Sequence, residues 1–207
     1  PAWSRLRFTM DDGLKSAVRK AFVSLYNSGL IIRGNYMVNW CTHDGALSDV
    51  EVEHKEHIGK LYYLRYFLKD SDEFVVVATT RPETYFGDTA VMINPNDERY
   101  TSLIGKKVVL PLIGREIPII ADEHVDMSFG TGVVKVTPAL DQNDYEVGNR
   151  HGLEFITIFD EKGILNDECG EFKGLERLDA RQKVVAKLQE IGNVEKTEDY
   201  TNQVGYC

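Results

Sequence analysis

Apolar residues recur at helical spacing in three stretches of the chain. Residues 14–29 carry apolar side chains on one helical face, and a glycine stands where that helix would stop. A second helix is predicted over residues 139–150, where a preceding proline suits the helix entry. A third helix is predicted over residues 178–191, again followed by a glycine.

Short apolar runs separated by turn residues occupy most of the remaining chain. The run at residues 61–68 is rich in Tyr, Phe and Leu on both faces of the pleat, which predicts a buried strand. The charged stretch at residues 50–56 is expected to be a solvated connector. Further strands are expected over residues 36–40, 73–80, 89–93, 107–112, 116–120, 132–137 and 154–159. Many short strands with few helices between them predict an α+β fold, a mixed or antiparallel β-barrel flanked by helices.

Composition is that of one substantial globular domain: 207 residues, of which 43% are hydrophobic. No apolar run approaches the roughly 20 residues that a membrane-spanning helix needs. The net charge of −9 argues against a broad nucleic-acid-binding face but allows contact with an RNA end, where phosphates are few. Because Pro1 is not a natural start, the chain is expected to be a fragment of a longer protein.

Three cysteines lie far apart in the sequence: Cys41, Cys169 and Cys207. This spacing fits a reducing, cytoplasmic protein better than a disulfide framework. None belongs to a Cys-x-x-Cys pair, so no metal site is expected. The sequence also contains no P-loop and no Gly-x-Ser-x-Gly motif. His124 and His151 are expected to be ordinary surface or packing residues.

Two predicted strands end in clusters of hydroxyl and charged side chains. In the first cluster, Thr79, Thr80 and Arg81 follow an apolar run, and Pro82 should end the strand because proline cannot donate to a ladder. Hydroxyls and an arginine at a strand end can hydrogen-bond a sugar or a phosphate. A capped turn with a surface ion pair between Arg81 and Glu83 is an equally open interpretation.

The second cluster lies roughly fifty residues further along the chain. Gly130 lets the backbone approach a neighbour closely. Lys135 and Thr137 are two apart on a predicted strand and therefore share one face. Asp141 and Asp144 are three apart in a predicted helix and also share a face, with Asp141 in the first turn. Either the two clusters meet in a polar pocket, or the lysine and the acids form only an ion pair and helix caps.

A family resemblance favours the pocket. The stretches that carry it are Val38-Asn39-Trp40, Ala46-Leu47-Ser48-Asp49-Val50-Glu51-Val52-Glu53, Arg81-Pro82-Glu83-Thr84, Gly87-Asp88-Thr89-Ala90-Val91, Asn94-Pro95-Asn96-Asp97-Glu98-Arg99-Tyr100, Pro118-Ile119-Ile120-Ala121-Asp122 and Val133-Val134-Lys135-Val136-Thr137-Pro138-Ala139. Together they resemble the editing domain of class I aminoacyl-tRNA synthetases, a large insertion in the catalytic domain of the valyl, isoleucyl and leucyl enzymes. Lys135 and the Gly-Asp-Thr-Ala-Val string are typical of the valyl members.

The resemblance implies a division of the chain. Residues 1–40 resemble the part of the catalytic domain that leads into the insertion, and residues 41–60 would be a connector. Residues 61–200 would form the editing domain, and residues 201–207 a truncated return segment. One departure stands out, because Leu140 occupies a place where the family commonly has a histidine.

The function implied is post-transfer editing, the hydrolysis of the ester that joins threonine to tRNA(Val). Discrimination between valine and threonine by an apolar pocket is an established example of weak selectivity corrected by a second, editing site. The resemblance assigns the α-ammonium of threonine to Asp144. It assigns the threonine side chain and the attacking water to Lys135, Thr137 and Asp141.

The remaining predicted contacts are to the terminal adenosine of the tRNA. Thr79, Thr80 and Arg81 would contact the ribose, and Phe129 and Gly130 would form the floor under the adenosine. The editing domain is expected to need no cofactor, with ATP used elsewhere in the parent synthetase. The expected partners are the tRNA 3′ end and the parent's catalytic domain, in a cytoplasmic monomer. Alternatives are a non-catalytic module that docks the tRNA end, or the editing domain of an isoleucyl or leucyl enzyme.

Overall fold

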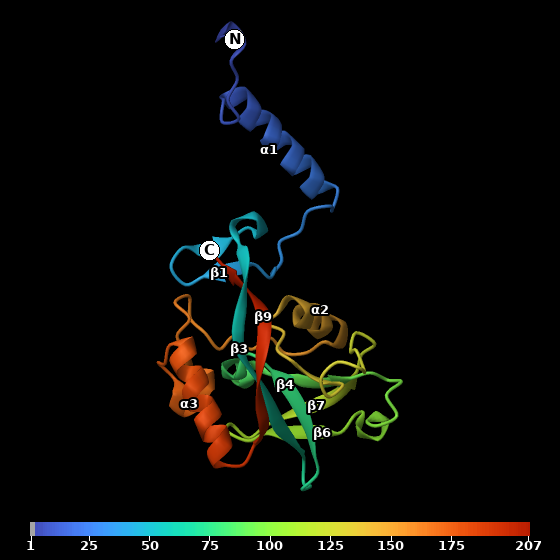
Figure 1. Ribbon diagram of the computed structural model, residues 1–207. Helices are drawn as coiled ribbons and strands as arrows, with labels where there is room; N and C mark the ends of the chain where they lie inside the picture. The colour runs from blue at the N-terminus through green and yellow to red at the C-terminus, as the bar shows by residue number, and fades with distance from the viewer. Residues whose placement is uncertain (1–2) are drawn as a thin grey trace. The chain divides into compact units, whose positions relative to one another are not determined.

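The computed structural model describes residues 3–207, which form two compact units (Figure 1). The first unit ends at Tyr36 and contains the short 3₁₀ helix η1 (Trp3–Arg5) and the helix α1 (Asp12–Asn27). The helix predicted over residues 14–29 is therefore confirmed, beginning and ending two residues earlier. Its apolar side chains, such as Val18 and Phe22, are exposed.

The second unit, Met37–Cys207, is built on a curled seven-stranded sheet. Its strands are β3 (Glu53–Leu68), β4 (Phe74–Thr79), β5 (Ala90–Ile93), β6 (Lys107–Leu110), β7 (Arg115–Ala121), β8 (Val133–Val136) and β9 (Val194–Tyr206). The strand order is β4-β3-β6-β7-β5-β8, with β9 paired to β3, and only the β5–β7 pair is parallel. The two outer strands of this path, β4 and β8, lie against each other, so the sheet is a nearly closed mixed barrel, as the sequence predicts.

Helices and short connections complete the second unit. The helices are α2 (Gln142–His151) and α3 (Arg177–Glu190), close to their predicted ranges. A separate hairpin consists of β1 (Asn39–Cys41) and β2 (Gly45–Leu47). The 3₁₀ helices are η2 (Asp49–Glu51), η3 (Pro82–Gly87), η4 (Thr101–Leu103) and η5 (Asp167–Phe172).

The strand pair β3–β9 corrects one prediction and includes one strand that the sequence did not predict. β3 begins at Glu53, so most of the charged stretch expected to be a connector is strand. β9 was not predicted, and it continues through the segment interpreted as a return. Figure 1 shows β9 in red running beside β3 in teal. Their exposed ends pair from Glu53 opposite Tyr206 to Lys60 opposite Asp199, where backbone pairing and not burial defines the strands. Because charged side chains lie on both faces of these strand ends, the hydrophobic pattern of the sequence does not predict them.

Two other predicted strands differ from the structure. Within residues 36–40, only the last two belong to a strand, since β1 begins at Asn39. Residues 154–159 form no strand, because only Phe159 makes an isolated bridge, to Leu165. Ile156 and Ile158 are buried at alternating positions, which explains the strand-like pattern. Alternating burial alone does not define a β-strand, because a strand also needs backbone hydrogen bonds to a neighbouring strand.

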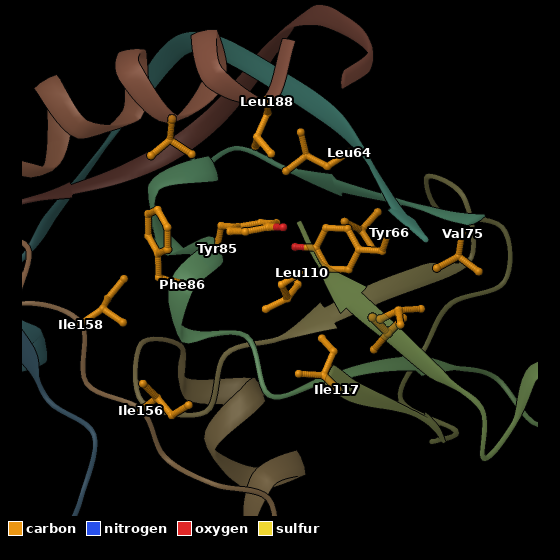
Figure 2. Close-up of a cluster of buried hydrophobic side chains, with 14 of the residues drawn as sticks. Leu64, Tyr66, Val75, Tyr85, Phe86, Leu110, Ile117, Ile156, Ile158 and Leu188 are labelled. Atoms are coloured by element: carbon orange, nitrogen blue, oxygen red, sulfur yellow. The ribbon is translucent and has the colours of Figure 1, made fainter. Parts of the chain in front are cut away.

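The core lies between the barrel and α3 and anchors η3 (Figure 2). Tyr66 of β3 and Tyr85 of η3 meet edge to face with ring centroids 5.5 Å apart, and Phe86 packs on Phe172. Leu188 of α3 covers the same cluster. All six residues of η3 are buried. The chain directly after β4 is therefore held rigidly by the core.

Among residues 3–207, no helix is both long enough and apolar enough to cross a lipid bilayer.

Candidate functional site

A cavity of about 590 Å³ brings the two predicted clusters together in the second unit. Seventeen residues line it: Leu61, Ala78, Thr79, Thr80, Arg81, Met92, His124, Val125, Asp126, Phe129, Val134, Lys135, Asp141, Asn143, Asp144, Tyr200 and Asn202. The ends of β4 and β8 are adjacent because the barrel almost closes between them. The predicted polar pocket therefore exists, and Thr137 and Gly130 are the predicted residues that do not line it.

One wall of the cavity is the end of β4. Thr79 Oγ1 accepts a hydrogen bond from the backbone N–H of Arg81 at 3.1 Å, which turns the chain out of the strand. Arg81 then reaches across to the other wall, where its Nη2 donates to Asp141 Oδ2 at 3.1 Å. Glu83 instead pairs with Arg181, at 2.7 and 2.6 Å. The ion pair between Arg81 and Glu83 that the sequence left open is therefore not formed.

The opposite wall contains Lys135 at its base. The Lys135 Nζ donates to Asp88 Oδ1 at 3.0 Å and to Thr137 Oγ1. Thr137 Oγ1 in turn donates to Asp88 Oδ1 at 2.7 Å. Thr137 is 1% exposed and so lies beneath the cavity instead of in its wall. The Lys–Asp ion pair does form, but with a partner that the sequence interpretation did not name.

The start of α2 supplies both acids of the second cluster. Asp141 is the N-cap residue, and its Oδ1 accepts from the N–H groups of Asn143 and Asp144 at 3.0 and 3.3 Å. Asp144 Oδ2 accepts from the N–H of Thr137 at 2.8 Å, which ties α2 to β8. Burial raises the pKa of Asp144 to about 6, opposed by the charge of Lys135 and by the Thr137 hydrogen bond. Asp144 is therefore a buried acid whose charge is sensitive to its neighbours.

A glycine-rich loop before β8 forms the rim. Phe129 is 61% exposed at the cavity edge. Gly130 and Gly132 both have positive φ, +59° and +77°. A Cβ on Gly132 would stand 2.5 Å from Nη2 of Arg99, the end of a flexible side chain, so the positive φ is the stronger reason for glycine at this position. Arg99 also donates to the carbonyl of Met127 at 2.9 Å, which fixes the loop beside Phe129.

Leu140, the departure from the family pattern, contributes through its backbone. Its carbonyl oxygen accepts from Arg81 Nη1 at 3.3 Å, beside the contact of that guanidinium with Asp141. Its side chain packs on the main hydrophobic core and lies close to Gly87. A leucine therefore completes the core here without lining the cavity.

Several cavity residues were not identified from the sequence. His124, expected to be an ordinary surface or packing residue, lines the cavity, as does the neighbouring Asp126. Tyr200 and Asn202 line the cavity from β9, a strand that has no apolar periodicity and was therefore not predicted. Asp88 lies below the cavity; the sequence pattern assigned it no role beyond its place in the Gly-Asp-Thr-Ala-Val string, two residues before the fully buried strand β5.

Two cysteines far apart in the sequence are neighbours in the structure. The Sγ atoms of Cys41 and Cys207 lie 3.3 Å apart, and the Cys41 Sγ donates to Asp44 Oδ2 at 3.5 Å. Among the described residues, these three form the one cluster whose donor atoms lie close enough to share a metal ion. Three ligands are one fewer than a structural zinc site uses, and the cluster is separate from the cavity lining.

The fold and the cavity belong to a synthetase domain. The model of the family described as "tRNA synthetases class I (I, L, M and V)" matches residues 2–197, and the chain belongs to that family. Over 207 residues it is 70% identical to valine–tRNA ligase of Campylobacter jejuni (strain RM1221) and 72% identical to that of Helicobacter hepaticus (strain ATCC 51449 / 3B1). It is 59% identical to valine–tRNA ligase of Thermotoga maritima over 206 residues. The resemblance to the valyl members is therefore confirmed.

These relatives are much longer than the chain. The match covers 100% of the chain but only 24% of the Campylobacter jejuni protein and 23% of the Helicobacter hepaticus protein. A solved structure also shares the fold: agnB2 LeuRS of Agrobacterium radiobacter K84, in a ternary complex with tRNA and LeuAMS, has a TM-score of 0.50 at 20% identity. That likeness covers 94% of this chain and 33% of the LeuRS chain.

Proposed function

We propose that this chain is the editing domain of a valyl-tRNA synthetase and that it hydrolyses the ester of threonyl-tRNA(Val). The observation that carries the proposal is the 590 Å³ cavity, which unites the Thr79–Arg81 strand end with Lys135 and the α2 acids. The identity to valine–tRNA ligases over the whole chain supports the valyl assignment over an isoleucyl or leucyl one.

Charge and hydrogen bonding suggest how an aminoacyl ester would bind. The carboxylate of Asp144 would accept a charge-assisted hydrogen bond from the α-ammonium of the amino acid. Thr79, Thr80 and Arg81 would hydrogen-bond the ribose of the terminal adenosine, while Phe129 and Gly130 would support its base. The ester would thus be held at two ends, which is the main requirement for attack by a positioned water.

Selection of threonine would depend on its hydroxyl. Lys135 and Asp141 both face the cavity, so they can hydrogen-bond that hydroxyl and order the attacking water. Valine has no hydroxyl to accept the remaining N–H of Lys135, and the loss of that one hydrogen bond would cost about 1–3 kcal/mol. Thr137, whose hydroxyl is committed to Asp88 and Lys135, would act by holding Lys135 and not by touching the substrate.

The test is deacylation by the full-length synthetase that contains this chain. We expect hydrolysis of threonyl-tRNA(Val) and little hydrolysis of valyl-tRNA(Val) or threonyl-tRNA(Ile). Asp144→Ala should abolish the activity, and Lys135→Ala or Asp141→Ala should reduce the preference for threonine over valine. Wild-type deacylation rates in Asp144→Ala would contradict the role of that residue, and unchanged discrimination would remove Lys135 and Asp141 from the selectivity.

The alternative from another class is a module that only docks the tRNA end. That function predicts binding of a non-hydrolysable threonyl-adenosine analogue with no turnover of threonyl-tRNA(Val). The proposed enzyme should both bind the analogue and hydrolyse the ester. As part of a synthetase, it would have the tRNA 3′ end and the parent's catalytic domain as partners, act as a cytoplasmic monomer and need no cofactor for editing.

A further inference from the structure

Asp88 is a carboxylate with no exposed surface directly below the cavity floor. Its Oδ2 accepts from the hydroxyl of Tyr66 at 2.5 Å, and its Oδ1 accepts from Lys135 and Thr137 at 3.0 and 2.7 Å. Since a buried carboxylate is costly unless it is paired and hydrogen-bonded, this arrangement accounts for its burial. It does not explain why the core contains a charged residue at all, since a well-packed apolar residue would often make the fold as stable or more stable.

The partner of Asp88 is the feature that points to function. The side chain of Lys135 is 11% exposed, and that small exposed part lines the cavity. An ammonium has three N–H donors, and Asp88 and Thr137 take two of them. The third is available to a ligand in the cavity. The contacts below the floor thus fix the direction of the donor above it.

The backbone around Asp88 allows it little freedom. Its N–H donates to the carbonyl of Tyr85 at 3.2 Å as the C-cap of η3. A Cβ on the preceding Gly87 would stand 3.0 Å from Cγ2 of Thr137 and 3.3 Å from the carbonyl oxygen of Ile156, so the chain passes closely by both residues. Figure 2 shows the hydroxyl of Tyr66 directed into the middle of the core. Asp88 is therefore a fixed acceptor to which a longer, flexible lysine must adjust.

We infer that Asp88 is a positioning residue of the proposed editing reaction: it holds the Lys135 ammonium in the orientation that donates to the threonine hydroxyl. The inference rests on the proposed function. Asp88 itself is shielded from the cavity and would not touch the substrate. Threonine would accept the third N–H of Lys135, whereas valine has no acceptor for it.

The test compares Asp88→Asn with the unsubstituted full-length synthetase in single-turnover deacylation of threonyl-tRNA(Val). Asparagine keeps the shape and the acceptor oxygen but removes the charge that orients Lys135. We expect the maximal rate to fall about tenfold or more, with the half-saturating enzyme concentration changed by less than about twofold. Aminoacylation with valine should be unchanged. Glu116→Gln is the matched control, since it removes a carboxylate that bridges Lys69 and Lys107 away from the cavity lining, and it should leave deacylation unchanged.

A double-mutant cycle with Lys135→Met separates positioning from general support of the fold. If Asp88 acts through Lys135, Asp88→Asn should have no further effect on the rate in the Lys135→Met background. A general structural effect would appear in both backgrounds and would overturn the inference, as would a normal rate in Asp88→Asn alone. If Asp88→Asn does not fold, Tyr66→Phe removes only one hydrogen bond of Asp88 and should show a smaller loss with the same dependence on Lys135. Absence of deacylation in the unsubstituted enzyme would instead contradict the proposed function.

Discussion

Asp144 shows how a residue in the cavity can work against the stability of the fold. It is 8% exposed, and burial raises its pKa from 3.8 to about 6. A carboxyl group with a raised pKa in the folded state favours folding fully only below its unfolded pKa. That stability is lost as the pH rises from about 4 through 6, where the unfolded chain ionises more readily. At neutral pH the protein thus keeps a charge that the core disfavours.

Asp144→Asn should therefore make the protein more stable and less active. At pH 7.5 we expect its free energy of unfolding to exceed that of the wild type by about 1–3 kcal/mol, a difference that should shrink towards pH 4. Urea denaturation at both pH values measures this. Asp167→Asn, which changes an exposed acid, is the control. A variant no more stable at pH 7.5 than at pH 4, relative to wild type, would contradict the raised pKa.

The charge of Asp144 should also control activity. Deacylation of threonyl-tRNA(Val) by the wild type should fall as the pH drops below about 6, because the protonated carboxyl can no longer pair with an α-ammonium. Asp144→Asn should be slower by about 100-fold at pH 7.5, the cost of losing one partner of a buried charge pair. A pH–rate profile from pH 5 to 8 measures the first effect, and equal rates at pH 5 and 7.5 would contradict it.

At the scale of elements, η3 connects the cavity to the core. Its N-cap, Arg81, lines the cavity, and its C-cap, Asp88, lies below the cavity and binds Lys135. Glu83 within it is 3% exposed and forms a two-pronged ion pair with Arg181 of α3. Helix α3 lines no part of the cavity but holds η3, which directly follows the cavity residue Arg81.

Removing the α3 side of this ion pair should loosen η3. Arg181→Ala leaves the buried carboxylate of Glu83 without its partner, and we expect a loss of about 2–4 kcal/mol in the free energy of unfolding. Arg177→Ala removes a more exposed arginine from the same helix and should change stability by less than about 0.5 kcal/mol. Urea denaturation of both variants measures the two changes in the free energy of unfolding. Equal effects would mean that the ion pair does not hold η3.

At the scale of the whole molecule, the cavity depends on how the barrel closes. β4 and β8 are not ladder partners, yet they lie against each other. Thr131, just before β8, joins them: its Oγ1 donates to the carbonyl of Val76 in β4 at 2.6 Å. The same oxygen accepts from the N–H of Val133 at 3.3 Å. One hydroxyl thus connects the two strands whose ends carry the predicted clusters.

Thr131→Val keeps the side-chain shape and removes this connection. We expect a loss of about 1–2 kcal/mol in stability, since the carbonyl of Val76 and the N–H of Val133 both lose a partner. Deacylation should fall with it, because the two walls would no longer be held at one distance. Thr101→Val, which removes an exposed hydroxyl in η4, is the matched control. A Thr131→Val protein as stable as that control would show that packing alone closes the barrel.

Local sequence patterns predict the elements that bury apolar side chains, and the chemistry at the ends of two of them. Helices α2 and α3 and strands β4 to β8 follow from local periodicity, as do the clusters at Thr79–Arg81 and Lys135–Asp144. β9 did not follow, because its polar residues are ordered by pairing with β3 and not by burial.

Which charges meet depends on the tertiary structure. Arg81 pairs with Asp141, 60 residues away, and not with its neighbour Glu83. Lys135 pairs with Asp88, 47 residues away, and not with the acids of α2. Local sequence fixes which groups a strand end presents, because that depends on the alternation of side chains. Their partners depend on the register and closure of the barrel, which no local pattern encodes.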